Sequence, residues 1–404
     1  MKRYYLGVDW SDKFHEVCVV EEAEKKLAEM KVEESPEGMS EFGRWLDEQR
    51  GQGIELWAAI EKPEGRIVDF LLDHGVMVYP INPKALDRAR ARFRMSRSKS
   101  DPFDAWVLSE FLRTDHAHLR PLKPSSVEAQ ELKILTRDYQ RLVQQKTQLL
   151  NQLRATLKEY YPRPLEVFAD LDSQIALAFL KEYPAPKRIS RRKWERFARE
   201  HRLGEVRALK MWEAVKKPQL SMPEHVVRAK GQLMEVLVEE LEVVVKAVDQ
   251  YTERVEHFFA ALPAAKLTER LPGGKSGITV PTLWAELGDA IGRWESFRHL
   301  QAQAGTVPVT RSSGKSQIVE FRFACNKHLR HALYLLAFIS LRQSDWAKAY
   351  YRSQRAKGHR HHRALRALGA KWLKIIFVMC RDHVPYDENY HLANMARQSL
   401  HQAA

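Results

Sequence analysis

Hydrophobic and polar positions in the first part of the chain alternate between strand-like and helix-like spacing. Short β-rich runs separated by polar stretches predict strands at residues 4–8, 14–21, 27–32, 54–60 and 76–81. Apolar residues three or four apart predict helices at 36–50, 63–74 and 101–112. Ser35 is placed to cap the first helix, and Gly75 follows the end of the second.

This order of elements favours one α/β architecture. Three consecutive strands followed by helix, strand, helix, strand and helix indicate three antiparallel strands extended by parallel ones. That is the ribonuclease H-like (RuvC-like) order, and we assign it to residues 1–125.

Two long helical patterns dominate the middle of the chain. No glycine or proline interrupts residues 127–161, and only Gly231 interrupts 224–262, where apolar residues fall near heptad spacing. The two helices are expected to pair as a hairpin or coiled coil over residues 126–265. The basic and aromatic stretch between them, about residues 165–223, is expected to form short helices as an insertion.

The last part, residues 266–404, is predicted to be mainly α-helical. Helices are expected at 280–288, 298–304, 327–343, 345–357 and 364–381. Between the second and third of them, a basic segment rich in glycine and serine, residues 306–317, is expected to be a loop.

Composition and charge narrow the class of protein. No apolar run approaches the roughly 20 residues that a membrane span needs, and the N-terminus reaches Asp9 too early for a signal peptide. The three cysteines are too few and too scattered for a disulfide framework, so a reducing cytoplasm is expected. A formal net charge of +14 indicates a polyanionic partner, most simply nucleic acid.

The basic residues are concentrated in runs. The first run has six cations without an acid, and two more follow at residues 187–207 and 327–374. A solvated helix face explains any one run, whereas three runs favour an electrostatic surface for nucleic acid. The candidate nucleic-acid-binding residues are Arg88, Arg90, Arg92, Arg94, Arg97, Lys99, Arg311, Lys315, Arg330 and Arg360.

Four carboxylates stand at positions that the predicted fold brings together. Asp9 ends the first strand, Glu61 ends the fourth, and Asp101 and Asp104 lie three apart on the following helix. Each alone has an ordinary explanation; Asp101, for example, suits a helix N-cap. Together they predict a site for two Mg²⁺ ions, because hard divalent cations relieve the repulsion between carboxylates and can activate a phosphate for attack.

At this point the residues resemble a known family, the Piv-invertase-like transposases of insertion sequences. Their Asp-Glu-Asp-Asp domain is similar to Gly7-Val8-Asp9, Glu61 and Ser98-Lys99-Ser100-Asp101-Pro102-Phe103-Asp104-Ala105. The resemblance continues at Leu135-Thr136-Arg137, Asn151-Gln152-Leu153-Arg154, Leu271-Pro272-Gly273, Glu286-Leu287-Gly288-Asp289, Ala304-Gly305-Thr306-Val307-Pro308, Ser312-Ser313-Gly314-Lys315 and Leu329-Arg330-His331-Ala332-Leu333-Tyr334. It covers nearly the whole chain in order.

The resemblance implies a DNA recombinase with two catalytic parts. Ser313 aligns with the family's nucleophile, with Ser312 as the alternative, and would form a phosphoserine while Mg²⁺ polarises the DNA phosphate. It further implies a structured guide RNA (a bridge RNA) that pairs with donor and target DNA, a tetramer, and a C-terminal transposase domain. The location that it implies is the bacterial cytoplasm, in association with the nucleoid.

Two other functions remain open from the sequence. A metal-dependent nuclease or Holliday-junction resolvase would use only the carboxylates and would not need Ser313. A nucleic-acid-binding protein without activity would keep the fold and lose any dependence on metal. The four carboxylates together favour an enzyme.

Overall fold

The structure, a computed structural model, describes residues 2–93, 100–123, 125–219, 222–288, 294, 296–313 and 316–403. The chain forms two compact units, residues 1–124 and 125–404. Each has its own hydrophobic core.

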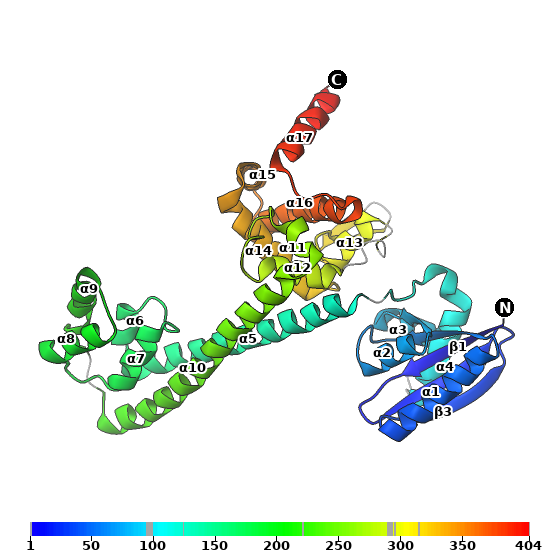
Figure 1. Cartoon of the computed structure of the whole chain (residues 1–404), viewed down its shortest axis with the longest axis horizontal. Coiled ribbons are helices and arrows are strands. Elements are labelled where there is room, and N and C mark those ends of the chain that lie inside the picture. The colour runs from blue at the N-terminus through cyan, green and yellow to red at the C-terminus, as the bar shows by residue number, and fades with distance from the viewer. Residues whose placement is uncertain are drawn as a thin grey trace. The chain divides into compact units, whose positions relative to one another are not determined.

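The first unit is built on a five-stranded mixed sheet with strand order β3-β2-β1-β4-β5 (Figure 1). Strands β1, β2 and β3 are antiparallel, whereas β4 is parallel to β1 and β5 is parallel to β4. The antiparallel part with its parallel extension is therefore confirmed. The bounds are β1 Arg3–Asp9, β2 Phe14–Glu21, β3 Lys26–Glu33, β4 Glu55–Ile60 and β5 Met77–Pro80.

Helices cover both faces of this sheet. Helices α1 (Pro36–Gly51) and α2 (Arg66–Asp73) contribute to the core on one face, and α3 (Pro83–Phe93) and α4 (Asp101–Asp115) contribute to the core on the other. Along β1, Leu6 and Val8 belong to the first core while Tyr5 belongs to the second, as the two-residue period of a strand requires. The mixed α/β character predicted for this part is confirmed.

Helix α3 is a helix of the first unit that the sequence pattern missed. Of its eleven residues only Leu86 and Ala89 are buried, and four of the others are Lys or Arg. Two buried residues give almost no hydrophobic periodicity, so the sequence of this segment indicates only a run of charged residues. In the structure this helix brings Arg90 to α4.

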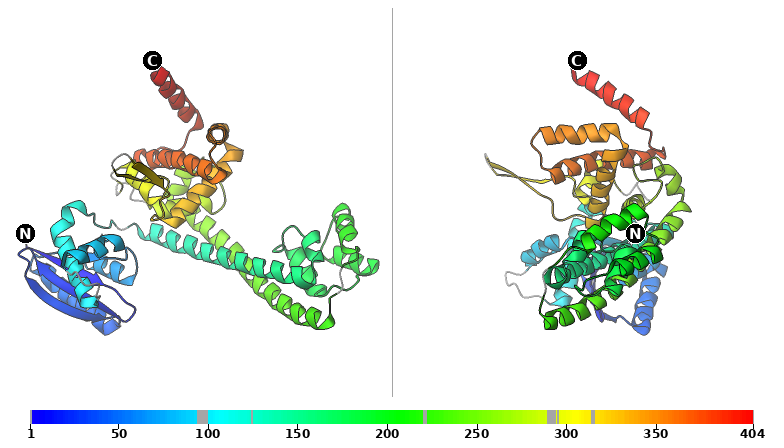
Figure 2. Two further views of the ribbon diagram at one scale, coloured as in Figure 1. Left: turned by 180° about the vertical axis from the view of Figure 1, so that it is seen from behind. Right: turned by 90° about the vertical axis from the view of Figure 1, so that its left-hand side faces the viewer.

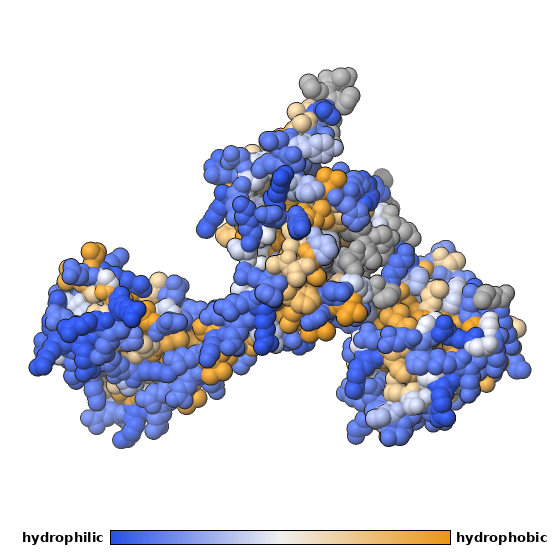
Figure 3. All heavy atoms as spheres, in the orientation of Figure 1, coloured by the Kyte–Doolittle hydropathy of each residue, from blue (hydrophilic) through white to orange (hydrophobic). Residues whose placement is uncertain are grey.

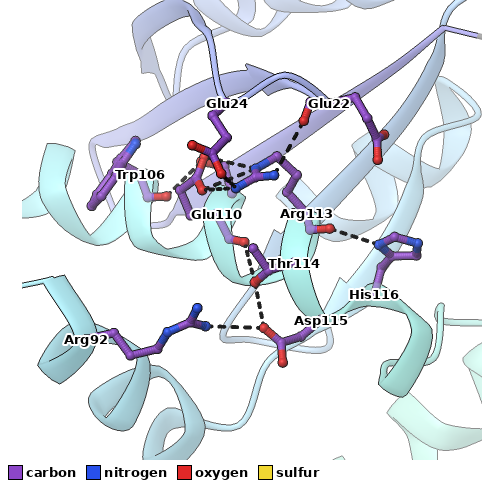
Figure 4. Close-up of polar contacts among 10 residues, drawn as sticks. Glu22, Glu24, Arg92, Trp106, Glu110, Arg113, Thr114, Asp115 and His116 are labelled. Carbon is purple, nitrogen blue, oxygen red and sulfur yellow. Dashed lines mark hydrogen bonds and ion pairs between the residues drawn. The ribbon is translucent and has the colours of Figure 1, made fainter.

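The C-terminal half of α4 is held by a polar network (Figure 4). Arg113 pairs with Glu110 at 2.7 Å within the helix and with Glu24, in the β2–β3 turn, at 2.9 Å. Arg92 of α3 lies 3.5 Å from Asp115 at the end of α4. These contacts join α4 to β2–β3 and to α3, so they fix the helix whose first turn carries Asp101 and Asp104. A short 3₁₀ helix, η1 (His116–His118), follows α4.

The second unit contains the predicted helical hairpin. Helices α5 (Val127–Tyr160) and α10 (Glu224–Ala260) lie side by side and run in opposite directions (Figures 1 and 2). Buried α10 residues at heptad-like spacing, Leu237, Leu241, Val244 and Val248, share a core with Leu149 and Leu153 of α5. Both helices are within two residues of their predicted bounds.

Short helices cover the far end of this hairpin, as expected for the insertion. They are α6 (Arg163–Val167), α7 (Gln174–Glu182), α8 (Arg191–Glu200) and α9 (Glu205–Val215). Their core is aromatic: Trp194 and Phe197 of α8 stack at 5.6 Å between centroids, and Phe179 of α7 meets Phe197 edge-on.

The other end of the hairpin enters a second, larger helical core. Its helices are α11 (Pro263–Thr268), α12 (Thr279–Leu287), α13 (Phe297–Gln303), α14 (Lys327–Gln343), α15 (Asp345–Ala356) and α16 (His361–Asp382). Helix α17 (Glu388–Ala403) follows, and none of its described residues belongs to this core. Trp372 is fully buried there and its indole N–H donates to the Ser340 hydroxyl at 3.0 Å. The mainly helical character of this part is confirmed; α11 and α17 were not predicted.

The segment predicted as a loop, residues 306–317, instead contributes to a two-stranded antiparallel ribbon. Strands β6 (Val309–Ser313) and β7 (Ser316–Glu320) pair from Val309↔Glu320 to Ser313↔Ser316. Nine of their ten residues are exposed and the tenth, Val309, is half-buried, so neither face needs a run of hydrophobic residues. That absence explains why the pattern indicated a loop. In the right-hand view of Figure 2 the ribbon extends away from the helices.

The surface is largely hydrophilic on the face shown in Figure 3. Across the part of the chain that the structure describes, no helix combines the length and apolarity needed to cross a membrane.

Candidate active site

The register of the sheet places Asp9 beside Glu61. Val8 of β1 pairs with Ile60 of β4 in the parallel ladder, and the next residue of each strand is the carboxylate. The carboxyl ends of parallel neighbours meet at one sheet edge, which is where α/β proteins commonly place polar sites. On the other side of β1, Asp9 pairs with Glu16 of β2.

Helix α4 crosses this part of the sheet at unusually short range. A Cβ atom on Gly7 would lie 1.8 Å from the carbonyl oxygen of Ala105 and 2.5 Å from the amide nitrogen of Ser109. Glycine at position 7 is therefore what lets the helix backbone contact β1. The helix begins with Ser100 as N-cap, so Asp101 is its first residue rather than the cap.

Arg90 occupies the centre of the carboxylate cluster. Its Nε and Nη2 donate to the two oxygens of Asp104 at 2.6 and 2.8 Å, a bidentate pair. The same guanidinium lies 3.7 Å from Glu61 and 2.6 Å from Asp87. Asp104 is only 7% exposed, so this ion pair is largely withdrawn from solvent.

The charge of Asp9 is not balanced in this arrangement. Burial, followed by the nearby charges of Asp104, Asp101 and Glu61, raises the pKa of Asp9 to about 6, and Arg90 lowers it only in part. A carboxylate that is partly protonated near neutral pH lies in a site that lacks positive charge.

This charge deficit and the donor chemistry fit a hard divalent cation. All four candidate ligands are carboxylates, the ligand type that Mg²⁺ binds in proteins. Among the described residues, however, no three His, Cys, Asp or Glu side chains are arranged as they stand to hold a metal ion. Asp104, whose two oxygens both face Arg90, is the carboxylate that must be released from its present partner.

Two further residues border the site and were not among the predicted site residues. The ammonium group of Lys62 lies over the ring of Trp10, 3.9 Å from its centroid. These residues directly follow Glu61 and Asp9, so the contact joins the ends of β4 and β1. A lysine and a tryptophan 52 positions apart carry no pattern that marks them as a pair.

The candidate nucleic-acid-binding residues fall in different surroundings. Arg88 and Arg92 are exposed on α3, whereas Arg90 of the same run is the cluster's internal cation. Arg330 is half-buried and Arg360 is exposed. Arg94, Arg97, Lys99 and Lys315 lie outside the described residues.

Ser313 is the last residue of β6 and Ser312 precedes it; both are exposed. Because side chains alternate along a strand, Ser313 shares a face of the ribbon with Arg311, and Ser312 takes the opposite face. Arg311 pairs with Glu320 across the ribbon at 3.3 Å. Ser313 and the carboxylates belong to different compact units.

Comparison with known families accounts for both units. A family model of DEDD-type IS110 transposases, described as "Transposase", matches residues 6–162. A second model, described as "Transposase IS116/IS110/IS902 family", matches residues 266–352. The first match includes all four carboxylates, and the second includes the β6–β7 ribbon.

Similar proteins extend over most of the chain. The "Mini-circle putative transposase for IS117" of Streptomyces coelicolor is 32% identical over 399 residues, 95% of either chain. The "Insertion element IS900 uncharacterized 42 kDa protein" of Mycobacterium paratuberculosis is 25% identical over 389 residues, 95% of this chain and 96% of the relative. The "Insertion element IS110 uncharacterized 43.6 kDa protein" of Streptomyces coelicolor is 27% identical over 302 residues, 72% of either chain.

These comparisons confirm the resemblance to insertion-sequence transposases that the sequence indicated. They do not support a mechanism with a serine nucleophile. The DEDD domain itself points to carboxylate chemistry with a divalent metal. Both family models match this chain, and a relative that is 32% identical aligns with 95% of it. The chain therefore belongs to the IS110/IS116 family of insertion-sequence transposases.

Proposed function

We propose that this transposase is a DNA recombinase whose RuvC-like unit cleaves DNA strands with divalent metal. The observation that carries the proposal is the cluster of Asp9, Glu61, Asp101 and Asp104, in which the pKa of Asp9 is raised to about 6 by burial and by the other three acids. The five-stranded sheet with its central β1–β4 pair supports a ribonuclease H-like fold for this unit.

The chain's own residues prepare this site for a phosphate. Mg²⁺, when bound by the carboxylates, would polarise the scissile phosphate and stabilise its added negative charge. Gly7 permits the close approach that keeps Asp101 and Asp104 near the sheet. Arg90 holds Asp104 in place and, once released from it, can donate to a phosphate oxygen in the same bidentate geometry.

We further propose that Ser313 is the nucleophile. The hydroxyl oxygen of Ser313 forms a bond to phosphorus, the bond from phosphorus to the deoxyribose oxygen breaks, and the hydroxyl proton passes through solvent to that leaving oxygen. Support comes from its exposure at the end of β6 and from Arg311 on the same face of the ribbon. Strand exchange follows when another strand's hydroxyl reverses this step.

The proposal includes a structured guide RNA and a tetramer. The family resemblance and the net charge of +14 support a second nucleic acid besides DNA. Sequencing the RNA that copurifies with the protein, from cells that also carry the flanking noncoding DNA, tests the guide. One discrete, enriched RNA from that DNA supports guided recombination, and unselected cellular RNA contradicts it.

Strand cleavage tests the catalytic residues. Donor DNA labelled at one end is incubated with the protein, copurified RNA and Mg²⁺, and products are separated under denaturing conditions before and after protease treatment. Wild type is expected to give a protein–DNA adduct. Asp104→Asn and Ser313→Ala are expected to lose it, while Ser316→Ala, the exposed serine paired with Ser313, keeps it.

The same assay separates the alternatives. Loss of the adduct in Ser312→Ala but not in Ser313→Ala would move the nucleophile by one residue. Cleavage that needs Asp104 but survives both serine substitutions without an adduct would identify a nuclease or junction resolvase that uses only the carboxylates.

A further inference from the structure

An aromatic and arginine cluster lies where the chain leaves the ribbon. Phe321 and Phe323 directly follow β7, with Phe321 37% and Phe323 76% exposed. Their rings meet edge-on, with centroids 5.0 Å apart. The guanidinium carbons of Arg330, from α14, and Arg366, from α16, lie 5.0 and 4.5 Å from the centroid of Phe321.

Backbone contacts hold this cluster in place. Arg330 donates to the carbonyl oxygen of Arg322 at 3.3 Å, and Arg322 in turn donates to that of Val307 at 3.3 Å. The segment between the two phenylalanines is therefore attached to α14 and to the chain just before β6. A fixed aromatic surface loses less conformational entropy on binding than a free one.

The cluster carries uncompensated positive charge. Burial, and then repulsion from Arg330 and Arg363, lowers the pKa of Arg366. In the part of the chain that the structure describes, Arg330, Arg363 and Arg366 make no ion pair with a carboxylate. Three neighbouring guanidinium groups without an acid favour the binding of an anion from outside the chain.

Exposed rings beside such cations suit one class of ligand. A guanidinium stacked on a ring keeps its N–H edge free for phosphate oxygens, and the exposed ring offers a flat face to a base. The bases of a duplex already stack on one another, so a side chain that stacks on a base face needs an unpaired strand. An acidic peptide would use the arginines but not the exposed face of Phe323.

We propose that Phe321, Phe323, Arg330, Arg363 and Arg366 form a binding site for unpaired nucleotides, in which the rings stack on bases and the arginines bind the adjoining phosphates. Of these residues, only Arg330 was a candidate from the sequence. The site deepens the proposed recombinase function and rests on it for the origin of the strand, either opened DNA or unpaired guide RNA.

Fluorescence anisotropy of the full chain with labelled oligonucleotides tests the site. The probes are a twelve-nucleotide oligo(dT) and an oligo(U) of equal length, in EDTA so that no cleavage occurs. Phe323→Leu is expected to weaken binding about tenfold, within the range for one lost stacking contact. The matched control is Phe338→Leu, another exposed phenylalanine, 44% exposed on α14.

The arginines are tested through salt dependence. Arg363→Gln, at an exposed position, is expected to reduce the slope of log affinity against log salt by about 0.7, the value for one phosphate contact on a single strand. Exposed Arg342→Gln on α14 is the control and keeps the wild-type slope. Because Phe323 and Arg363 are exposed, both variants are expected to keep the wild-type thermal unfolding midpoint, which is measured in parallel.

The outcomes are distinct. Weakening by Phe323→Leu beyond that by Phe338→Leu supports the site, and the probe that loses more affinity identifies DNA or RNA as its source. Equal affinity of wild type, Phe323→Leu and Arg363→Gln for both probes would overturn it. Asp104→Asn separates this proposal from the proposed recombinase function, since it is expected to remove strand cleavage without altering oligonucleotide binding. If the wild-type protein cleaves no DNA but Phe323→Leu still weakens oligonucleotide binding, the nucleotide-binding site is kept and the recombinase function is rejected.

Discussion

A single missing side chain sets the distance between α4 and β1. Because a Cβ atom on Gly7 would lie 1.8 Å from a backbone oxygen, Gly7→Ala must push the helix and its two carboxylates away from Asp9. We expect the variant to lose about 1 to 3 kcal/mol of stability, the usual range for overpacking, as measured by urea unfolding. Gly51→Ala is the control, since a Cβ there meets nothing within 4 Å. Equal stability of both variants would show that the approach is looser.

The raised pKa of Asp9 makes stability depend on pH in the metal-free protein. A carboxyl whose pKa is about 6 when folded, against 3.8 as its ordinary value, favours folding in its neutral form. That contribution is present at low pH and is lost as pH rises from about 4 to 6. Asp9→Asn is therefore expected to gain in melting temperature over wild type as pH rises from 4.5 to 7.5.

The control for this comparison is Asp12→Asn, in the exposed β1–β2 turn. Its difference from wild type is expected to stay constant over the same pH range. Saturating Mg²⁺ is expected to stabilise wild type and remove the advantage of Asp9→Asn, because the ion supplies the missing positive charge. An advantage that does not change with pH would contradict the assigned repulsion.

Arg90 competes with a divalent ion for Asp104. Replacing it by glutamine removes a positive charge within 2.8 Å of both Asp104 oxygens. We expect Arg90→Gln to bind Mn²⁺ about tenfold more tightly, as a change of about 1.4 kcal/mol in local electrostatic energy would give. Electron paramagnetic resonance of free Mn²⁺ measures this, with Arg88→Gln as the exposed control. Weaker binding by Arg90→Gln would mean that Arg90 orders the ligands instead.

The sequence located the carboxylates but not their partner. Asp9, Glu61 and the Asp101/Asp104 pair follow from strand ends and helix spacing, both of which are local patterns. Arg90 lies in a run of basic residues typical of an exposed surface, and only the packing of α3 against α4 places it beside Asp104. Long-range pairing of this kind leaves no periodic signal in the chain.

At the scale of elements, burial decides what the sequence could predict. Strands β1, β2 and β4 and helices α5, α10 and α14 each bury one side or both, so their hydrophobic periods are clear. Helix α3 and the β6–β7 ribbon bury almost nothing and were missed. Two-stranded ribbons of this kind are marginal in water on their own.

Three separate elements meet at one buried acid. Glu286 of α12 is completely covered and accepts two hydrogen bonds from Arg137 of α5, at 2.8 and 3.2 Å, and one from Asn326 at 2.7 Å. Asn326 also caps α14. Two of the family-like sequence segments therefore converge on this ion pair although 149 residues separate them.

Removing this acid tests the junction. Glu286→Ala removes the buried acid to which Arg137 and Asn326 both donate and is expected to cost about 3 kcal/mol, as for other broken buried pairs. Urea unfolding measures the loss, and Glu239→Ala, exposed on α10, is expected to change stability by less than about 0.5 kcal/mol. A similar effect of both substitutions would mean that the pair contributes nothing beyond a surface charge.

At the scale of the whole molecule, the two compact units have separate cores and are expected to unfold separately. Calorimetry of the metal-free protein should show two transitions. Gly7→Ala is expected to lower only the transition of residues 1–124, and Glu286→Ala only that of residues 125–404. A single transition shifted by both substitutions would instead show that the units unfold cooperatively.

The length of the α5–α10 hairpin determines how long a nucleic acid must be to contact both of its ends. At about 1.5 Å per residue, the 37 residues of α10 extend for roughly 55 Å from end to end, with one part of the helix in the core shared with α6–α9 and its last turns in the core that contains Trp372. That length corresponds to about one and a half turns of B-form DNA. A nucleic acid that touches both ends of the hairpin at once must therefore span about 16 base pairs, so nuclease footprints shorter than this would report contact with one end only.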